Sequence, residues 1–405
     1  MKLAAALLPL LSVAVASAEA TYRPQRITYE ALVDDKTFNE NGAHEAFLDA
    51  LSNVGVVSVT GIPTSLSKKE VLTWNFHDCV KQHSQTTQET VYADGTIRRT
   101  LATHTLPGPD GAQKIFDEPP SSDACESFVR SSEVFRSVVA EVTQAFASRL
   151  TSVLGDSIEA PLMVAKDGSD SFHTFADVVA NGEHLEHFHS YQHGGHDVEV
   201  PTIDLHTDQG LFLVFTPGQL VKDAPEHASK VIKGFYIELA NESLVQMEFD
   251  DEDDLVFLLG DGVQQYINPK IKGGGRQLRA TPHVLSMPSH EANEARVWYG
   301  RMVLPPSSAY SEVHGMSYGN LRHLMVDATI AAEKVGKDVV DIGCSSSLTT
   351  RHLEKCAKGT LYCWHRCMTN VKCSKGQKLK CMDSNGNEWD GSTHSSAFAP
   401  RCKAK

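Results

Sequence analysis

The chain has 405 residues, of which 41% are hydrophobic and 22% are charged. This composition is typical of a globular protein with a sizeable core, and it excludes a disordered or fibrous chain. The length predicts a main domain with appendages. The formal net charge of −14 argues against a nucleic-acid partner, because contacts with phosphate groups require clustered cations.

Residues 1–20 have the features of a secretory signal peptide. Lys2 gives a positive start, residues 3–15 are largely apolar, and Ala16-Ser17-Ala18 is a cleavage site of the small-x-small type. The apolar run is too short to span a bilayer, and no later segment reaches the required length. We therefore expect a secreted, extracellular protein without a transmembrane segment.

Residues 21–157 are expected to form an N-terminal α/β region. Asn41 is a candidate N-cap for a helix whose apolar face includes Ala43, Phe47, Leu48 and Leu51. Gly55 would end that helix, and the β-branched run at 56–60 predicts a strand. Residues 104–123 are rich in Pro, Gly and Asp, and they predict a loop. Apolar residues at helical spacing then predict a long helix over 126–154, which Gly155 stops.

Short β-rich runs separated by turns dominate residues 158–310, the segment expected to form the catalytic core. They lie at 211–216, 231–239, 255–259 and 296–304. This spacing predicts a mainly β core of the sandwich or jelly-roll type, with flanking helices. The acidic run at 250–254 is expected to be a solvated turn. Residues 311–343 are expected to be a C-terminal helical segment.

Residues 344–405 form a basic, cysteine-rich tail. They contain 11 Lys and Arg against 4 Asp and Glu, and seven of the nine cysteines. Such density in a secreted chain predicts a small module stapled by disulfide bonds. Cys363, His365 and Cys367 leave zinc as an alternative, which the signal peptide disfavours. The tail can dock on the acidic body or on an anionic external surface. The odd cysteine total leaves at least one thiol free or paired outside the chain.

The first candidate for a metal-binding segment is Leu205-His206-Thr207-Asp208-Gln209-Gly210, which opens a predicted strand. Alternate strand residues project from one face, roughly 6–7 Å apart at their α-carbons. One imidazole and one carboxylate there can share a metal ion, with a third ligand from another strand. Two histidines and one carboxylate suit Fe(II) and dioxygen. Alone, the triplet is a weak signal, since with 19 histidines about one is expected by chance.

Later segments complete a pattern. Gly260-Asp261-Gly262 follows the apolar run 255–259, Gly275-Arg276 precedes Pro282-His283, and Arg296-Val297-Trp298 lies beyond. Together with the helix and strand at 46–63, they resemble the isopenicillin N synthase-like family of 2-oxoglutarate and Fe(II)-dependent dioxygenases. The resemblance spans roughly residues 27–310. It implies a double-stranded β-helix, or jelly-roll, core wrapped by helices.

The resemblance also implies roles for individual residues. His206, Asp208 and His283 would bind iron and be the catalytic set. Arg296 would form a forked ion pair with the distal carboxylate of 2-oxoglutarate. Tyr191 would contact the same cosubstrate or be a core aromatic residue. The expected enzyme hydroxylates or desaturates a small organic substrate with dioxygen and 2-oxoglutarate, and ascorbate is a candidate reductant.

Some features depart from the family pattern. Trp298 stands where the family's serine would help to hold 2-oxoglutarate, which keeps open an iron oxidase of the same fold that does not use this cosubstrate. Arg301 is an alternative to Arg296, although strand alternation places it on the opposite face. His290 is an alternative to His283. A catalytically degenerate binding protein that acts through its tail is a further alternative.

A second histidine cluster lies just before the proposed ligands. Five histidines fall within 13 residues, at His184, His187, His189, His193 and His196. They can form a second metal site of a zinc hydrolase or a proton-rich pocket wall. We expect instead a polar loop leading into the strand of His206.

Overall fold

The computed structural model describes most of the chain between residues 20 and 323. The described ranges are 20–39, 42–63, 75–82, 88–92, 94–108, 112–116, 121–192, 202–222, 230–250, 254–287 and 294–323, with five short strands after residue 343. Residues 1–19 of the predicted signal peptide and residues 324–343 lie outside these ranges. Among the helices so described, none combines the length and the hydropathy that a membrane span requires.

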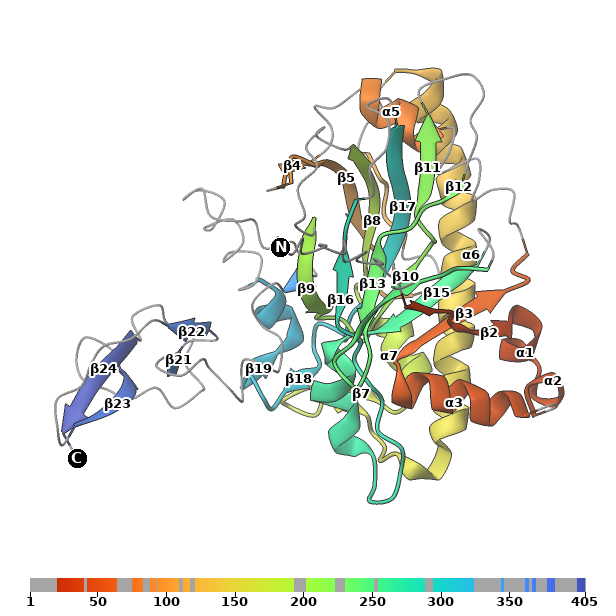
Figure 1. Ribbon diagram of the computed structural model, residues 1–405. Helices are drawn as coiled ribbons and strands as arrows, with labels where there is room; N and C mark the ends of the chain where they lie inside the picture. Colours follow the sequence, from red (N-terminus) through yellow and green to blue (C-terminus); the bar gives the residue numbers. More distant parts are fainter. Residues whose placement is uncertain are drawn as a thin grey trace, which may run out of the picture.

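Most strands belong to two sheets (Figure 1). The large sheet has the order β2 (Gln25–Thr28), β3 (Val56–Thr60), β15 (Leu255–Leu259), β10 (Phe212–Phe215), β17 (Glu294–Val303), β8 (Leu185–Gln192), β5 (Ile97–His104), β4 (Gln88–Val91). Two further strands extend it beside β17: β11 (Gln219–Lys222) pairs with β17, and β12 (Lys230–Val231) pairs with β11. The small sheet has the order β1 (Thr21–Tyr22), β14 (Leu244–Met247), β13 (Phe235–Glu238), β16 (His283–Leu285), β9 (Ile203–Asp208), β20 (Cys344–Ser345). The expected mainly β fold of the jelly-roll type, with flanking helices, is thereby confirmed.

The large sheet separates two apolar cores, as the period of two along its strands dictates. In β15, Phe257 faces outward and stacks on Phe146 of the long helix at 4.1 Å between ring centroids, whereas Val256 and Leu258 belong to the inner core between the sheets. All five residues of β15 are buried, because both faces of the strand are covered. The inner core surrounds the candidate site.

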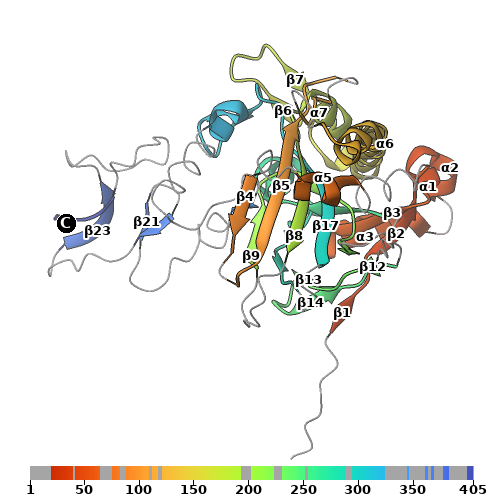
Figure 2. The same ribbon diagram turned by 90° about the horizontal axis from the view of Figure 1, so that it is seen from above.

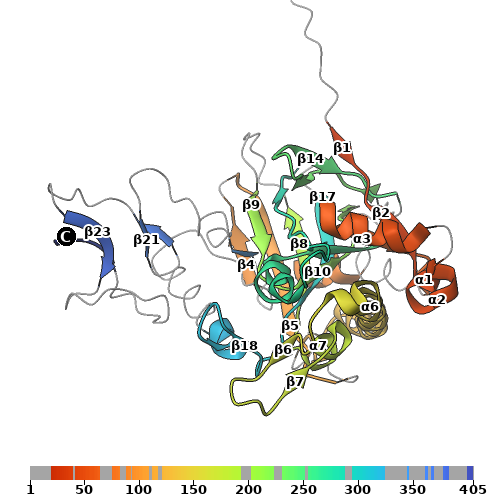
Figure 3. The same cartoon turned by 90° about the horizontal axis from the view of Figure 1, so that it is seen from below.

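Helices cover the outer face of the large sheet. The main ones are α3 (Ala43–Asn53), α6 (Asp123–Leu154) and α7 (Phe175–Asn181), and α6 lies on the side away from the small sheet (Figures 2 and 3). The predicted helix over 126–154 is α6, which Ser122 caps by accepting a hydrogen bond from the Cys125 amide at 3.2 Å. The predicted strand at 56–60 is β3. The N-cap of α3 is Gly42, and Asn41 lies outside the described residues.

Short elements complete the body: α1 (Tyr29–Val33), α2 (Asp35–Asn39), α5 (His77–Gln82), η4 (Gly155–Ser157), β6 (Met163–Val164), β7 (Ser171–Phe172), η5 (Val263–Ile267), η6 (Asn268–Lys270), β18 (Tyr310–Ser311) and β19 (Met316–Ser317). A disulfide joins Cys79 of α5 to Cys125 of α6. The disulfide links the first turn of α6 covalently to α5.

Three local predictions were wrong. The run 231–239 is not one strand, because Gly234 takes a left-handed conformation with φ +102° and sends β12 and β13 into different sheets. The acidic run is not wholly solvated, since Asp254 is buried, pairs with Arg26 at 3.0 Å and accepts a hydrogen bond from Ser58. The segment from 311 begins with the β18–β19 hairpin, and helix starts only at residue 318.

The tail contributes strands β20, β21 (Leu361–Cys363), β22 (Arg366–Met368), β23 (Gln377–Met382) and β24 (Ala399–Ala404). The last four form two antiparallel pairs, β21–β22 and β23–β24. β20 instead pairs with β9 of the small sheet, where Cys344 stands opposite Asp208. The disulfide framework of the tail stays a prediction, as does its boundary as a separate module.

Candidate metal centre

Three buried ligand-type side chains converge at the centre of the small sheet. His206 and Asp208 lie on β9, and the antiparallel register places His283 of β16 directly opposite His206. Nε2 of His206 lies 3.8 Å from Oδ1 of Asp208, and Nε2 of His283 lies 3.9 Å from Oδ2. Their ligand atoms all lie within 4.8 Å of one another. The predicted triad is therefore assembled as one group.

Backbone hydrogen bonds fix the orientation of both imidazoles. Nδ1 of His206 is 2.7 Å from the Asp204 carbonyl, and Nδ1 of His283 is 3.1 Å from the Thr281 carbonyl. A carbonyl only accepts, so each Nδ1 carries a proton, and Nε2 is the ring nitrogen that faces Asp208 and is left for a metal ion. Burial, and then the neighbouring His206, hold the pKa of His283 well below its usual value. Neutral imidazoles with free lone pairs are what a metal requires.

His206 supplies a separate sign that something is to be bound here. Its Nε2 is fully buried and makes no hydrogen bond within the described part of the chain. A buried polar atom without a hydrogen bond costs free energy that a coordinated cation would offset. The residues present thus fit a divalent metal ion with two nitrogen ligands and one carboxylate ligand.

The glycine-aspartate turn predicted from the sequence holds the end of β9 in place. The amide of Gly260 donates to the Leu211 carbonyl at 3.0 Å, and that of Gly262 donates to Gly210 at 3.0 Å. A Cβ atom on Gly260 would lie 2.7 Å from the Asp208 carbonyl oxygen and 2.3 Å from that of Gly210. A side chain at position 260 would therefore push against the backbone at the end of the ligand strand.

A cavity between the two sheets contains the triad. The small sheet supplies the ligands, and the large sheet supplies a wall from β5, β8, β10 and β17. Among the described residues, about half of those that line it are apolar or aromatic and one is a carboxylate: Gln88, Arg98, Thr100, Ala102, His187, His189, Tyr191, Ile203, His206, Asp208, Leu213, Phe215, Thr216, Gly218, Phe235, His283, Leu285, Arg296, Trp298 and Met302. Arg296 and Tyr191 were both predicted site residues, and both lie on this wall.

Arg296 is a buried cation with hydrogen-bonding capacity to spare. Only 3% of its surface is exposed. Its Nη1 donates to the Lys233 carbonyl at 3.1 Å, and its Nε has no hydrogen-bond acceptor among the described residues. Burial lowers the pKa of Arg296 to about 10, so the side chain remains charged at neutral pH. A buried guanidinium of this kind favours an anion in the cavity.

Tyr191 and Trp298 flank Arg296 on the same wall. Tyr191 is its cross-strand neighbour on β8 and is buried. Trp298 follows Arg296 by two residues on β17, and its ring lies over His189 at 4.6 Å between centroids. The indole Nε1 is buried and makes no hydrogen bond to any residue that the structure describes. The wall therefore offers a second unused donor beside the arginine.

The similarity of this chain to known proteins lies in its structure. No protein-family profile and no curated protein matches the sequence. A putative oxygenase from Shewanella oneidensis matches in structure with a TM-score of 0.50 and 13% identity, over 77% of this chain and 99% of that chain. The chain shares its fold with this oxygenase. At such identity the likeness concerns the fold alone, and the narrower isopenicillin N synthase-like assignment stays a prediction.

Two plant enzymes also match. A dioxygenase for auxin oxidation from rice matches with a TM-score of 0.47 and 15% identity, over 80% of this chain and all of that chain. The dioxygenase for auxin oxidation 1 from Arabidopsis thaliana, solved as a binary complex with 2-oxoglutarate, matches with a TM-score of 0.45 and 15% identity, over 70% of this chain and 93% of that chain.

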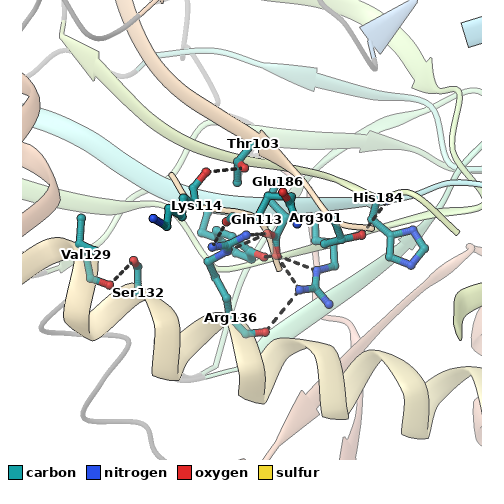
Figure 4. Close-up of polar contacts among 11 residues, drawn as sticks. Thr103, Gln113, Lys114, Val129, Ser132, Arg136, His184, Glu186 and Arg301 are labelled. Carbon is teal, nitrogen blue, oxygen red and sulfur yellow. Dashed lines mark hydrogen bonds and ion pairs between the residues drawn. The ribbon is translucent and has the colours of Figure 1, made fainter. Parts of the chain in front are cut away.

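The alternative arginine, Arg301, has another function. It lies on the opposite face of β17 from the cavity, as alternation predicted, in a buried cluster around Glu186 (Figure 4). Nε of Arg301 donates to Glu186 Oε1 at 2.9 Å, Nε of Arg136 donates to Oε2 at 2.7 Å, and Tyr299 donates to Oε1 at 2.6 Å. Burial raises the pKa of Glu186, but Arg301 and Arg136 outweigh it and hold the pKa at about 2. His290, the alternative to His283, lies outside the described residues.

The histidine cluster is not the loop that was predicted. His184 precedes β8, and His187 and His189 lie within it; His193 and His196 are not described. His184 is a core residue, since its Nε2 donates to the Val179 carbonyl at 3.0 Å and its Nδ1 accepts from the Leu304 amide at 3.2 Å. His187 and His189 belong to the cavity wall. Burial, and then the charge of Arg98, keep the pKa of His189 well below its usual value.

Proposed function

We propose that this protein is an Fe(II) and 2-oxoglutarate-dependent oxygenase that hydroxylates or desaturates a small organic substrate. One observation carries the proposal: the buried triad His206, Asp208 and His283 shares a single cavity with the buried, charged Arg296. A metal bound to three protein ligands keeps open positions, and an iron ion there would supply dioxygen activation. The chain's own residues bind and orient the partners of that reaction.

Arg296 supports 2-oxoglutarate as the cosubstrate. This dicarboxylate has one end that can approach the metal and a distal carboxylate that needs a cation. The planar guanidinium of Arg296 can bind that carboxylate through two parallel hydrogen bonds. The indole N–H of Trp298, two residues along the same strand face, can donate to it as well. Trp298 thus offers the donor that a serine hydroxyl would provide at this position.

The apolar remainder of the cavity suits an organic substrate. Leu213 and Phe215 of β10 and Phe235 of β13 contribute large apolar surfaces. A lining of this kind excludes water and positions a carbon chain by its shape. The substrate would therefore be held close to the metal, while its oxidised carbon is chosen by packing.

We further propose that the protein is secreted and begins after Ala18. The features of residues 1–20 support this, and so does the disulfide between Cys79 and Cys125, because such bonds persist in oxidising compartments. N-terminal sequencing of the protein from culture medium tests the cleavage site. A basic tail that binds an anionic external surface remains part of the same proposal, tested by retention on anionic vesicles at low and high salt.

The activity is tested with iron and 2-oxoglutarate under anaerobic conditions. We expect a metal-to-ligand charge-transfer band in the wild-type protein, and succinate after oxygen is admitted. His206→Ala and Asp208→Ala should abolish stoichiometric Fe(II) binding, whereas His104→Ala, at an exposed histidine of β5, should not. Iron binding without the band would favour the oxidase that does not use 2-oxoglutarate. Absence of iron binding in the wild-type protein would favour the degenerate binding protein.

A further inference from the structure

The turn between β13 and β14 carries the sequence Asn241-Glu242-Ser243. We propose that Asn241 is a modification site, at which an N-linked glycan is attached through Nδ2 in the secretory pathway. Asparagine, any residue except proline, and then serine or threonine form the acceptor triplet for this modification. The inference rests on the proposed secretion, and it goes beyond the proposed activity because it concerns a surface outside the cavity.

The acceptor triplet occurs once in the 405 residues of the sequence. A single triplet gives a single site, so the presence or absence of sugar on the whole chain reports on position 241 alone. Other exposed asparagines, such as Asn39 and Asn320, are not followed by serine or threonine two residues later.

Backbone hydrogen bonds close the turn and present its middle residues to solvent. The Glu242 amide donates to the Leu239 carbonyl at 2.9 Å, and the Leu239 amide donates to the Ser243 carbonyl at 2.9 Å. Glu242 takes a left-handed conformation with φ +67°, as the last residue of a three-residue hairpin loop commonly does. Ala240, Asn241 and Glu242 are exposed. A bulky group on Asn241 would therefore extend into solvent and displace no part of the core.

The two polar atoms of the Asn241 side chain have different surroundings. Oδ1 accepts hydrogen bonds from the Ser243 amide at 3.2 Å and from the Ser243 hydroxyl at 2.6 Å. A backbone amide can only donate, so the side-chain atom that it meets is the oxygen and Nδ2 lies on the other side. Within the part of the chain that the structure describes, Nδ2 donates to no residue. The atom that would carry the sugar is thus both exposed and unengaged.

The transfer needs only this nitrogen and an oligosaccharide carried on a lipid pyrophosphate. Nδ2 of Asn241 forms a bond to the anomeric carbon of the first sugar, and the bond from that carbon to the pyrophosphate oxygen breaks. Nδ2 loses one proton, and the lipid pyrophosphate leaves. Nothing is oxidised or reduced. The secretory compartment supplies the lipid-linked donor and the transferase.

The turn lies at the rim of the body, away from the cavity. β14 pairs with β13 on one side and with the short strand β1 on the other, and β14 and β1 lie at the edge of the body in two views (Figures 2 and 3). None of the described residues that line the cavity belongs to the range 239–244. A glycan at this turn should therefore leave the binding of metal and cosubstrate unchanged.

Expression of the full-length chain with its own signal sequence in cultured mammalian cells tests the inference. Protein from the medium and from the cell membranes is analysed by intact mass, before and after treatment with peptide N-glycosidase F. We expect a heavier and heterogeneous wild-type chain that becomes a single lighter species on treatment. The enzyme converts a glycosylated asparagine into an acid, so treatment in heavy-oxygen water should label the peptide that contains position 241.

Variants separate the acceptor atom from the triplet around it. Asn241→Gln should lose the added mass completely, and its Fe(II) binding should equal that of the wild-type protein. Ser243→Ala keeps the asparagine but breaks the triplet, so it should lose the added mass as well, whereas Ser243→Thr should retain it. Asn39→Gln is the matched control, because Asn39 is exposed but lies outside an acceptor triplet. This variant should carry the same glycan as the wild-type protein.

Three results would overturn the inference. A wild-type chain that is cleaved after Ala18 and carries no sugar would overturn it while leaving the proposed secretion intact. Sugar that persists in Asn241→Gln or in Ser243→Ala would show that the triplet is not the acceptor. A chain that keeps residues 1–18 and carries no sugar would refute secretion and modification together. The proposed oxygenase activity is measured separately by the charge-transfer band, so its failure is distinguishable from all three.

Discussion

Gly218 lies against the guanidinium of Arg296 so closely that a Cβ atom on the glycine would come within 2.5 Å of Nε. Gly218→Ala should therefore displace Arg296 and raise the Kd for 2-oxoglutarate, while Fe(II) binding stays stoichiometric. Titration of the charge-transfer band measures both. Gly273→Ala is the control, since nothing lies within 4 Å of a Cβ atom at that position. Equal Kd values for the two variants would show that Arg296 needs no such space.

Arg296→Lys tests the cosubstrate anchor itself. Lysine keeps the charge but loses one arm of the fork, which costs on the order of 2 kcal/mol, or about 30-fold in the Kd for 2-oxoglutarate. Iron affinity measured without 2-oxoglutarate should not change. An unaltered 2-oxoglutarate requirement would remove Arg296 from the site and favour the oxidase that does without this cosubstrate.

Trp298→Phe separates the indole N–H from the aromatic surface. Phenylalanine can still pack on His189, but it has no donor for the distal carboxylate. We expect the Kd for 2-oxoglutarate to rise about 10- to 100-fold, the effect of one hydrogen bond to a charged group. Trp298→Ser should bind the cosubstrate more tightly than Trp298→Phe if the donor matters. The reverse order would assign Trp298 to packing alone.

The cluster around Glu186 predicts a dependence of stability on pH. The pKa of Glu186 is about 2 in the folded protein, against an ordinary value of 4.5. A lowered pKa stabilises the fold above pH 4.5, and this contribution, about 3 kcal/mol, is lost as the pH falls from 4.5 toward 2. Urea unfolding across that window measures it.

Glu186→Gln should remove this part of the acid sensitivity. It should also lower the free energy of unfolding at pH 7 by about 3 to 5 kcal/mol, because two arginines would remain buried without their carboxylate. Glu89→Gln on the same sheet is a suitable comparison, since Glu89 is largely exposed. A similar small effect of both substitutions would mean that the cluster contributes little to stability.

The sequence was most informative where local pattern and tertiary role agree. The His206–Asp208 triplet, the β15 strand and the long helix α6 were all predictable, because each shows its own periodicity or motif. Position 283 could be placed only through the family resemblance. Nothing local shows that β16 pairs with β9 in a register that brings His283 opposite His206.

Strands with polar residues on both faces were not predictable. β8 was expected to be a loop because it is rich in Glu and His. In the structure, however, Glu186 is paired with arginines from α6 and β17, and His189 is hydrogen-bonded to Thr100 of β5. Arg98 was missed for the same reason. Two adjacent arginines, Arg98 and Arg99, are typical of a solvent-exposed segment. Only the pairing of β5 with β8 places Arg98 on the cavity face.

The short strand β20 has a consequence for the ligand strand. Cys344 and Ser345 pair with the edge of β9 at Asp208 and Thr207. The tail therefore covers backbone amide and carbonyl groups that would otherwise be unpaired at this edge of the sheet. Such edges template pairing with other chains. A chain ending at residue 342 is expected to fold and bind iron, yet to self-associate through β9 as its concentration rises. The cysteine-rich tail would then prevent oligomers from forming through the metal-binding strand, in addition to any binding function of its own.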